Sequence, residues 1–426
     1  MTDFDVIIVG ARIAGASLAL QMARQGYKVA LLDRDPRGSN TLSTHFLWPR
    51  GVSYLWRLGL GAELDALLPG RSRVHYVLDG IGIVGRVPVA ATSGRLRAVH
   101  GSAVGAGADY ACIRRQTLDA LLVDAAVAAG ATPIERAEVT RLTIDGDGRV
   151  RGVQGKRRGH AFSLSARFFV GADGRDSTLA RLVKAPTEEY RAVCTSTCWS
   201  YFSGVAPHDV VLAKTGRRGF GAATASDGRT MVLVWGPQED AARYLAMHDR
   251  QFQQCVAETA PAATVERLRR AVREEPFYRA VGLHALKRQS VVHNVLLAGD
   301  AACFKDQCTA SGITHALRDS ELAAAALSAC LDGRETESEA LTRYAARRTA
   351  DMHAYFEMAC QAAMMHPAKA DEKERMRALQ HDQDGADAFI SLCADSAVAD
   401  AAKPRLSTKG ASDDDRGAAG AAANDL

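Results

Sequence analysis

The hydrophobic pattern at the amino end predicts a strand, a helix and a second strand in close succession. An apolar run over residues 4–9 has the length of a strand, and Gly10 turns directly into a helical pattern that Gly26 ends. A second apolar run over residues 28–32 leads to Asp33. Such a β-α-β unit points the N–H groups at the start of its helix toward a pyrophosphate, and the acidic residue can accept hydroxyls of an adenosine ribose.

The turn of this unit departs from the G-x-G-x-x-G pattern at one position. Arg12 stands where the middle glycine allows the backbone to approach the phosphates most closely. Arginine adds bulk there and also places a cation beside two phosphates; the alternative is a surface arginine, with Gly10 and Gly15 serving as turn and packing glycines.

The pattern along the rest of the chain alternates between sheet and helix. Strands are predicted within 73–89, at 139–144 and 150–154 around a hairpin turn, and at 161–165, 192–205, 210–214, 231–235 and 295–298. Helices are predicted over 49–58, 118–129, parts of 240–273, 311–331, 336–364 and 370–398, and a loop over 94–107.

Composition indicates an ordinary globular protein and excludes several classes. Of 426 residues, 47% are hydrophobic and 24% are charged. The formal net charge of +4 is spread along the chain, so no nucleic-acid partner is expected. No run of 18 apolar residues is present, so no spanning helix is expected, and the start of the chain lacks the features of a secretory signal. Nine scattered cysteines predict reduced thiols without a metal site, in a cytoplasmic protein.

Two later motifs resemble the first turn, since each is a strand that runs into a turn with glycine and aspartate. A strand over 168–170 runs into a turn that contains Asp173 and Gly174, and the strand at 295–298 runs into Gly299 and Asp300 ahead of a long helix. A carboxylate at a strand end can hold ribityl or ribose hydroxyls, and the following helix offers its positive end to an anion.

With these motifs in this order, the chain resembles the FAD-dependent monooxygenases of the para-hydroxybenzoate hydroxylase type and the related geranylgeranyl reductase-like flavoproteins, over roughly residues 3–330. The resemblance implies a mixed α/β (α+β) fold, in which a Rossmann-like FAD-binding domain of the glutathione-reductase type carries an inserted antiparallel substrate sheet. The implied segments are 1–70, 101–190 and 280–330 for the FAD domain, 71–100 and 191–279 for the substrate domain, 331–400 for carboxy-terminal helices, and 401–426 for a tail expected to be disordered.

The resemblance also implies which residues face FAD. Those expected to face the pyrophosphate are Gly10, Arg12, Ile13, Ala14 and Gly15, and those expected to face the adenosine are Asp33, Arg34 and Val139. The rest of the cofactor is expected to contact Thr44, Arg115, Asp173, Asp300, Gly312 and Ile313. Two departures stand out. The arginine that usually follows the second motif's aspartate by seven residues is replaced by Ala180, with Arg181 next, and residues 303–309 contain none of the usual prolines.

The implied chemistry is hydroxylation, in which NAD(P)H reduces the flavin and O2 then forms a C4a-hydroperoxide that needs a dry pocket. The substrate would be a small aromatic or apolar metabolite, with secondary metabolism as one setting. His45 is the first catalytic candidate, as a base or as a structural residue that bonds its own loop. Lys305 and Asp306 are the next candidates, against the alternative of a surface ion pair, and Trp199 and Tyr201 line the substrate pocket or pack in the core.

Other functions stay open at this point. A flavin reductase or dehydrogenase of the geranylgeranyl reductase-like kind would not insert oxygen, and a non-enzymatic flavoprotein would serve as a binding module. A halogenase is disfavoured because the chain contains no Trp-x-Trp. The substrate, the choice between NADH and NADPH, and the choice between monomer and homodimer are not specified.

Overall fold

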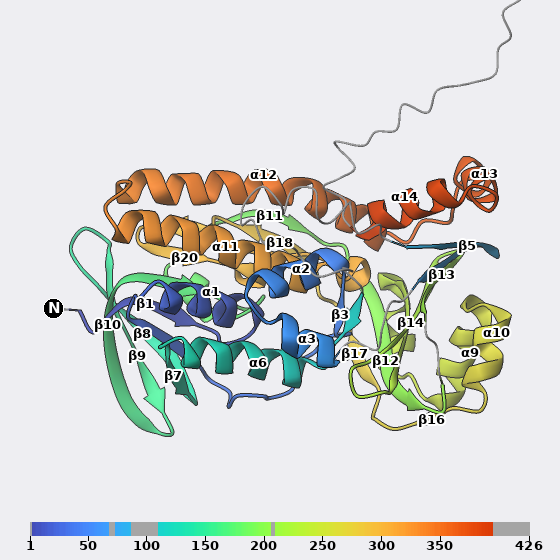
Figure 1. The fold of residues 1–426 in the computed structure, drawn as a ribbon, viewed down its shortest axis with the longest axis horizontal. Coiled ribbons are helices and arrows are strands. Elements are labelled where there is room, and N and C mark those ends of the chain that lie inside the picture. The colour runs from blue at the N-terminus through green and yellow to red at the C-terminus, as the bar shows by residue number, and fades with distance from the viewer. Residues whose placement is uncertain (1, 68–72, 87–109, 206–208, 395–426) are drawn as a thin grey trace, which may run out of the picture.

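The apolar run at the amino end forms β1 (Phe4–Val9), the middle strand of a mainly parallel sheet. The computed structural model describes residues 2–67, 73–86, 110–205 and 209–394 (Figure 1). In this sheet β1 pairs in parallel with β2 (Val29–Asp33) and with β10 (His160–Gly171). The outer strands are β7 (Thr132–Glu135), β20 (Val295–Leu297) and β19 (Val291–Val292).

Both faces of the parallel sheet are buried, which explains why its strands read as continuous apolar runs. On one face, Val6 and Ile8 of β1 belong to a core shared with α1 (Ile13–Arg24), α6 (Arg115–Ala128) and α11 (Gly312–Leu331). α12 (Glu337–Ala363) packs along α11, as the two long orange helices show (Figure 1). On the other face, Ile7 and Val9 pack with β8 (Ala137–Ile144), β9 (Val150–Arg157) and α7 (Thr178–Leu182).

β10 belongs to two sheets at once. Its residues 160–165 pair antiparallel with β9, and its residues from Ala166 onward pair in parallel with β1. The predicted antiparallel meander is therefore present, but the strands predicted separately at 161–165 and 168–170 are one continuous strand.

The second large sheet is antiparallel except for one parallel pair, β13 with β4. Its path runs β16 (Val272–Arg273), β12 (Thr195–Ser203), β15 (Thr230–Pro237), β14 (Arg218–Thr224), β13 (Val210–Thr215), β4 (Val74–Leu78) and β5 (Ile81–Gly85), and β17 (Tyr278–Ala280) also pairs with β12. The helices α8 (Ala241–Leu245), α9 (Asp249–Thr259) and α10 (Ala262–Leu268) follow it in sequence, and α9 packs on β13, β14 and β15.

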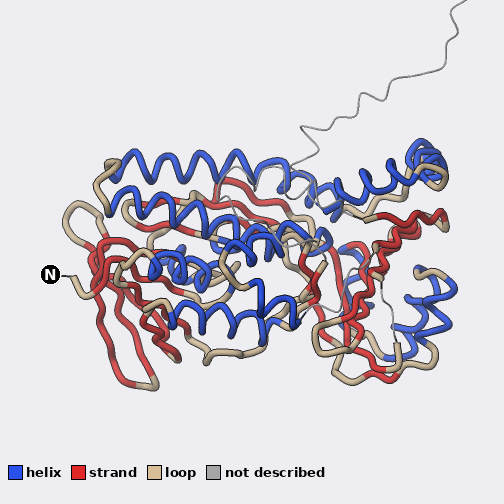
Figure 2. Tube along the Cα trace, in the orientation of Figure 1, coloured by secondary structure: helices blue, strands red, loops and turns tan. Residues whose placement is uncertain are grey.

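Short elements lie between the two large sheets. β3 (Phe46–Leu47) pairs with β6 (Ala111–Cys112), and β18 (Ala285–Arg288) pairs with both β11 (Thr187–Arg191) and β21 (Cys303–Phe304). Two 3-10 turns follow β20, η2 (Gly299–Ala301) and η3 (Gln307–Thr309), and α2 (Pro49–Arg57) and α3 (Gly61–Leu67) follow β3. Figure 2 shows that both halves of the molecule contain helices and strands, joined by loops.

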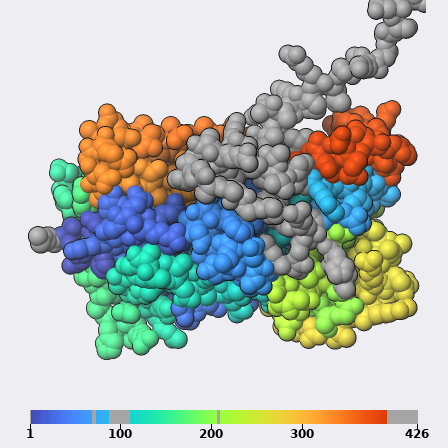
Figure 3. Space-filling model, viewed as in Figure 1, coloured from blue at the N-terminus to red at the C-terminus, as the bar shows by residue number. Residues whose placement is uncertain are grey.

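The carboxy-terminal helices differ from their prediction in one respect. The single helix predicted over 370–398 is two helices, α13 (Ala370–Leu379) and α14 (Gln383–Ala394). The break has a local cause, since Asp382 Oδ1 accepts the N–H of Gly385 at 2.9 Å. Both helices pack on β5, where the red residues adjoin the pale-blue ones (Figure 3).

Several predictions fall wholly or partly outside the described residues. They are the loop at 94–107, the tail at 401–426, the end of the strands within 73–89, the parts of the FAD domain at 1, 68–70 and 101–109, the parts of the substrate domain at 71–72, 87–100 and 206–208, and the end of the carboxy-terminal helices at 395–400. Within the described residues, no helix combines the length and apolar character needed to cross a membrane. The domain boundaries remain a prediction.

Candidate functional site

The Gly-rich turn after β1 depends on two close backbone approaches. Gly10 has φ +104°, and a Cβ there would lie 2.3 Å from the carbonyl oxygen of Ala172. A Cβ on Gly15 would lie 1.8 Å from the carbonyl oxygen of Gly10. Any side chain at either position would displace backbone, so both glycines are required by the geometry of the turn.

Asp33 ends β2 beside this turn and holds it in place. Its Oδ2 accepts the N–H of Ala11 at 2.7 Å and its Oδ1 accepts the N–H of Asp35 at 2.9 Å. A carboxylate has about four acceptor positions, so two remain for the ribose hydroxyls predicted for Asp33.

Arg12 lines the same cavity, but its charge is already paired within the protein. The guanidinium lies 3.2 Å from Asp35 Oδ2 and 3.4 Å from Asp119 Oδ2. It also donates to Ser39 and to the carbonyl oxygen of Asn40. These contacts fit a positioning role, in which Arg12 connects the turn to the segment after β2. They fit less well with the alternative of a solvated surface arginine.

Two helices start at the cavity. Among the described residues, no N-cap side chain accepts a hydrogen bond from the first turn of α1 or α11, and neither first turn contains an acidic residue. Ile13 opens α1, and Gly312 and Ile313 open α11. Unpaired N–H groups and the positive end of the helix dipole make each start a binding site for an anion or a partial negative charge.

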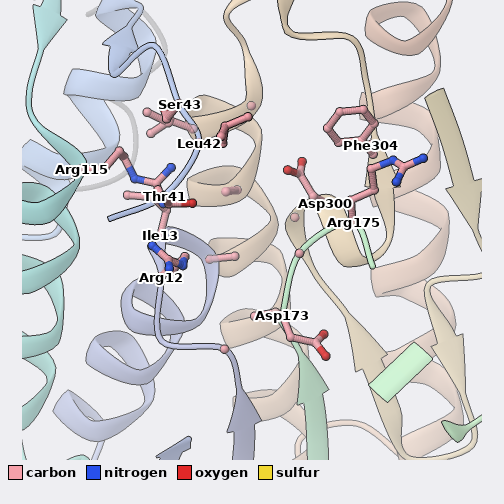
Figure 4. A pocket seen from close by; sticks show the side chains of 18 of the residues that line it. Arg12, Ile13, Thr41, Leu42, Ser43, Arg115, Asp173, Arg175, Asp300 and Phe304 are labelled. Atoms are coloured by element: carbon pink, nitrogen blue, oxygen red, sulfur yellow. The ribbon is translucent and has the colours of Figure 1, made fainter. Parts of the chain in front are cut away.

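Asp300 sits in η2 with its carboxylate directed into the cavity between these two helix starts (Figure 4). Burial raises the pKa of this carboxyl, although Lys305 and Arg115 act in the opposite direction. Gly299 precedes it at φ +61° and gives its N–H to Asp319 Oδ2 at 2.8 Å. The turn is thus fixed from behind, while the carboxylate of Asp300 faces the space where a ligand would lie.

Asp173 lines the cavity with its turn rather than with a free carboxylate. Its Oδ2 accepts the N–H groups of Thr178 and Leu179 at 2.7 and 3.1 Å, so the side chain caps the start of α7. Figure 4 shows it directed away from Asp300. Arg181 is exposed and does not line the cavity, whereas Arg175 of the same turn does.

His45 is not among the described residues that line the cavity, and its role as a base that acts on substrate stays a prediction. Its Nδ1 accepts the N–H of Arg115 at 2.7 Å, and the residue is 5% exposed with φ +64°. Burial, followed by the charges of Arg114 and Arg115, lowers the pKa of the imidazole to about 3. These contacts fit the structural alternative, in which His45 fixes the start of α6 and with it Arg115.

Lys305 and Asp306 do line the cavity, but they are not a surface ion pair. Lys305 is 7% exposed, and its Nζ lies 3.4 Å from Met352 Sδ. Asp306 is 2% exposed and accepts hydrogen bonds from the backbone and hydroxyl of Thr195 at 2.6 and 2.9 Å and from the N–H of Cys308 at 2.8 Å. Asp306 is thus engaged in joining η3 to β12, and it is a weaker candidate for proton transfer than Lys305.

The two aromatic candidates of β12 differ in their position relative to the cavity. Trp199 lines the cavity, and its indole N–H is buried without a hydrogen-bond partner among the described residues. Tyr201 is not among the described lining residues; the guanidinium carbon of Arg114 lies 3.6 Å from its ring centroid, and its ring makes a T-shaped contact with His45. The contacts of Tyr201 fit the core-packing alternative, and the pocket role of Trp199 stays a prediction that its position in the cavity wall favours.

A single cavity of about 590 Å³ joins these groups, within the roughly 300–1,000 Å³ typical of ligand sites. Of the predicted residues, Gly15, His45 and Tyr201 do not line it. Those that do are Gly10, Arg12, Ile13, Ala14, Asp33, Arg34, Thr44, Arg115, Val139, Asp173, Trp199, Asp300, Lys305, Asp306, Gly312 and Ile313. The donor set fits FAD: a glycine cradle and an uncapped helix for phosphates, carboxylates for hydroxyls, and a second uncapped helix.

Sequence reasoning missed several lining residues. Residues 41–43, Arg175, Phe304 and Gln307 all contribute to the wall. Their closeness in sequence to predicted residues could have indicated them, since 41–43 precede Thr44, Phe304 and Gln307 flank Lys305 and Asp306, and Arg175 follows Asp173 by two positions.

A doubly covered parallel sheet with a Gly-rich turn, a second sheet and this cavity defines a flavin-dependent oxidoreductase fold of the FAD monooxygenase superfamily. Residues 3–359 match the model of the FAD binding domain family, and the chain belongs to that family. The predicted family resemblance is thereby confirmed.

Similar proteins span the three enzymatic alternatives. The chain is 26% identical to a 6-methylpretetramide 4-monooxygenase of Streptomyces rimosus, over 81% of this chain and 80% of that protein. It is 23% identical to a digeranylgeranylglycerophospholipid reductase of Methanocella arvoryzae, over 80% and 82%. The structure of the myxobacterial chondrochloren halogenase superimposes with a TM-score of 0.72 at 20% identity, covering 92% of each chain, which shows likeness of fold.

Proposed function

We propose that this protein is an NAD(P)H-dependent FAD monooxygenase that hydroxylates a small aromatic or apolar metabolite. The observation that carries the proposal is the meeting of two uncapped helix starts, α1 and α11, and the inward-facing carboxylate of Asp300 in one cavity. That cavity continues to the face of the antiparallel sheet, where Trp199 forms part of its wall. A cofactor site and an apolar substrate site are therefore contiguous.

The residues that line the cavity indicate which of them would hold FAD. The backbone of Gly10, Ile13 and Ala14 would bind the pyrophosphate at the start of α1. The adenosine would lie by Asp33, Arg34 and Val139, the ribityl chain by Asp300, and the flavin pyrimidine edge by Gly312 and Ile313. This placement of FAD also implies that the FAD domain is of the glutathione-reductase type, which is a finer description than a mixed α/β fold.

When bound, FAD would accept a hydride from NAD(P)H and then react with O2. The start of α11 would stabilise negative charge at the pyrimidine edge, because its N–H groups and dipole present positive potential there. Lys305 would place a buried cation on the same wall, where its Nζ donates to the weak acceptor Met352 Sδ at 3.4 Å. We keep Lys305 as the catalytic candidate, since its ammonium can donate to a group in the cavity.

The apolar part of the wall would exclude water during the reaction. Phe46, Trp199 and Phe304 line the cavity beyond the cofactor residues, and all three are 9% exposed or less. Reactive oxygen species on a flavin are lost to water in open sites, so burial of this kind favours transfer to a substrate.

A reductase without oxygen insertion is the second candidate, favoured by the similarity to the Methanocella reductase. The test is NAD(P)H consumption by the FAD-loaded protein across phenols, quinones and polyketide-like aromatics under isotopically labelled O2. We expect substrate-stimulated consumption and product that carries one labelled atom. Product saturated or oxidised without the label would establish the reductase, and halogenated product formed only with added halide would establish the fold relative's chemistry.

A further inference from the structure

Gln307 lies where the cofactor cavity meets a second cavity. It opens η3, and it lines both the main cavity and a smaller adjoining one of about 60 Å³. Its Nε2 donates to Thr195 Oγ1 at 3.3 Å and to Thr197 Oγ1 at 3.2 Å. Its Oε1 is buried and has no hydrogen-bond partner among the described residues.

The orientation of the Gln307 amide is fixed by a chain of hydrogen bonds. Asp306 accepts the backbone N–H of Thr195 at Oδ2 and its hydroxyl hydrogen at Oδ1. Thr195 Oγ1 has then spent its single hydrogen and can only accept from Gln307. A rotated amide would set its oxygen against this acceptor, so the amide NH2 faces Thr195 and Oε1 is the atom left for a ligand.

The adjoining cavity specifies a neutral and mainly apolar occupant. None of the residues described as lining it carries a charge: they are Thr44, Phe46, Trp48, Thr197, Val210, Leu212, Gly221, Ala222, Ala223, Met231, Leu233, Trp235, Gln307, Cys308 and Ala310. A charged group that entered would lose its hydration without a counter-ion. Three aromatic rings among these residues suit a flat ring system.

We propose that Gln307 is a specificity-determining residue: its Oε1 accepts a hydrogen bond from a hydroxyl or N–H group on a neutral, flat, mainly apolar substrate seated where the two cavities join. The inference rests on the proposed function, since it places the substrate beside the cofactor. A ring without such a donor would bury Oε1 with no partner, and a buried acceptor left unmet costs more than an ordinary hydrogen bond contributes.

The test compares two probes that differ in one donor, 2-naphthol and 2-methoxynaphthalene, by equilibrium dialysis against the FAD-loaded protein. We expect the wild type to bind 2-naphthol roughly 3- to 10-fold more tightly. Gln307→Met, which keeps the length of the side chain, should reduce this ratio to within about twofold, whereas Gln307→Glu, which keeps an acceptor, should preserve a preference for 2-naphthol. Exposed Gln254→Met is the matched control and should leave the ratio unchanged.

FAD content, measured by absorbance in every variant, separates the two proposals. A wild type that fails to retain FAD contradicts the proposed function, independently of the naphthol ratio. Equal ratios in wild type and Gln307→Met, or no binding of either probe, overturn the role of Gln307. Loss of FAD from Gln307→Met with an unchanged ratio also overturns it, because Oε1 would then face the cofactor.

Discussion

Asp319 of α11 and Arg348 of α12 form an ion pair in which the two side chains are only 1% and 3% exposed, with Nε 2.9 Å from Oδ2. The same Oδ2 accepts the N–H of Gly299 at 2.8 Å. One carboxylate oxygen therefore connects the long carboxy-terminal helix to the turn that presents Asp300. The second oxygen of Asp319, Oδ1, has no hydrogen-bond partner among the described residues. The buried negative charge of this carboxylate is therefore balanced mainly by Arg348.

Replacement of Arg348 by methionine should leave a buried carboxylate without its counter-ion. We expect Arg348→Met to lower the free energy of unfolding by about 3–5 kcal/mol, measured by urea denaturation of the apoprotein. The double variant Asp319→Asn/Arg348→Met removes the charge and keeps an acceptor for Gly299, so it should recover a large part of this loss. Exposed Arg347→Met is the control, and a loss of the same size there would refute the assignment.

Asp300 should matter for the cofactor rather than for the fold. Burial raises the pKa of its carboxyl, so the charged form costs free energy in the empty protein. Asp300→Asn should leave the apoprotein at least as stable, yet weaken FAD binding roughly 10- to 100-fold through the loss of charge-assisted hydrogen bonds. Fluorescence titration with FAD checks the affinity, exposed Asp147→Asn serves as the control, and wild-type affinity in Asp300→Asn would remove this residue from the site.

His45 should make stability fall with acid in a defined window. Its pKa is about 3 in the folded protein against an ordinary value of 6.5, so the unfolded chain binds the extra proton first. The stabilisation is complete above pH 6.5 and is lost as the pH falls toward 3, by about 2 kcal/mol between pH 7 and 5. Asn tolerates the positive φ and does not titrate, so His45→Asn should show a flatter dependence of unfolding free energy on pH.

The matched control for this prediction is His353→Asn, since His353 is exposed on α12. Its pH dependence should follow the wild type. Identical slopes in the wild type and in His45→Asn would show that the imidazole does not supply the acid sensitivity.

The parts of the site that the sequence predicts are those where backbone geometry demands a residue type. Gly10 and Gly299 have positive φ, and Asp33 and Asp300 follow strands at the edge where parallel strands end. Such requirements leave local signatures in the sequence, and the residues concerned line or shape the cavity. The apolar runs of the parallel strands were predictable for the same reason, because burial of both faces removes any polar alternation.

The remaining features depend on partners that are distant in sequence. Nothing near Gln307 indicates that Thr195 would orient its amide, and nothing near His45 indicates the N–H of Arg115. β14 was missed because its glycines weaken a strand pattern, and the structure explains one of them. A Cβ on Gly219 would lie 1.9 Å from the ring of Trp235 on the neighbouring strand, so the glycine makes room for the indole.

A side chain at Gly15 should disturb the Gly-rich turn and thereby lower both the stability of the protein and its affinity for FAD. In Gly15→Ala the new methyl group would meet the carbonyl oxygen of Gly10, and this backbone atom cannot move without opening the turn against β10. We expect a loss of at least about 2 kcal/mol in unfolding free energy, together with weakened FAD binding. Gly146→Ala is the matched control, because a Cβ there meets open space, and it should change neither quantity by much. A Gly15→Ala protein with wild-type stability and FAD affinity would mean that the turn can relax, and the close approach between helix α1 and the turn after β1 would then not be what fixes the cofactor site.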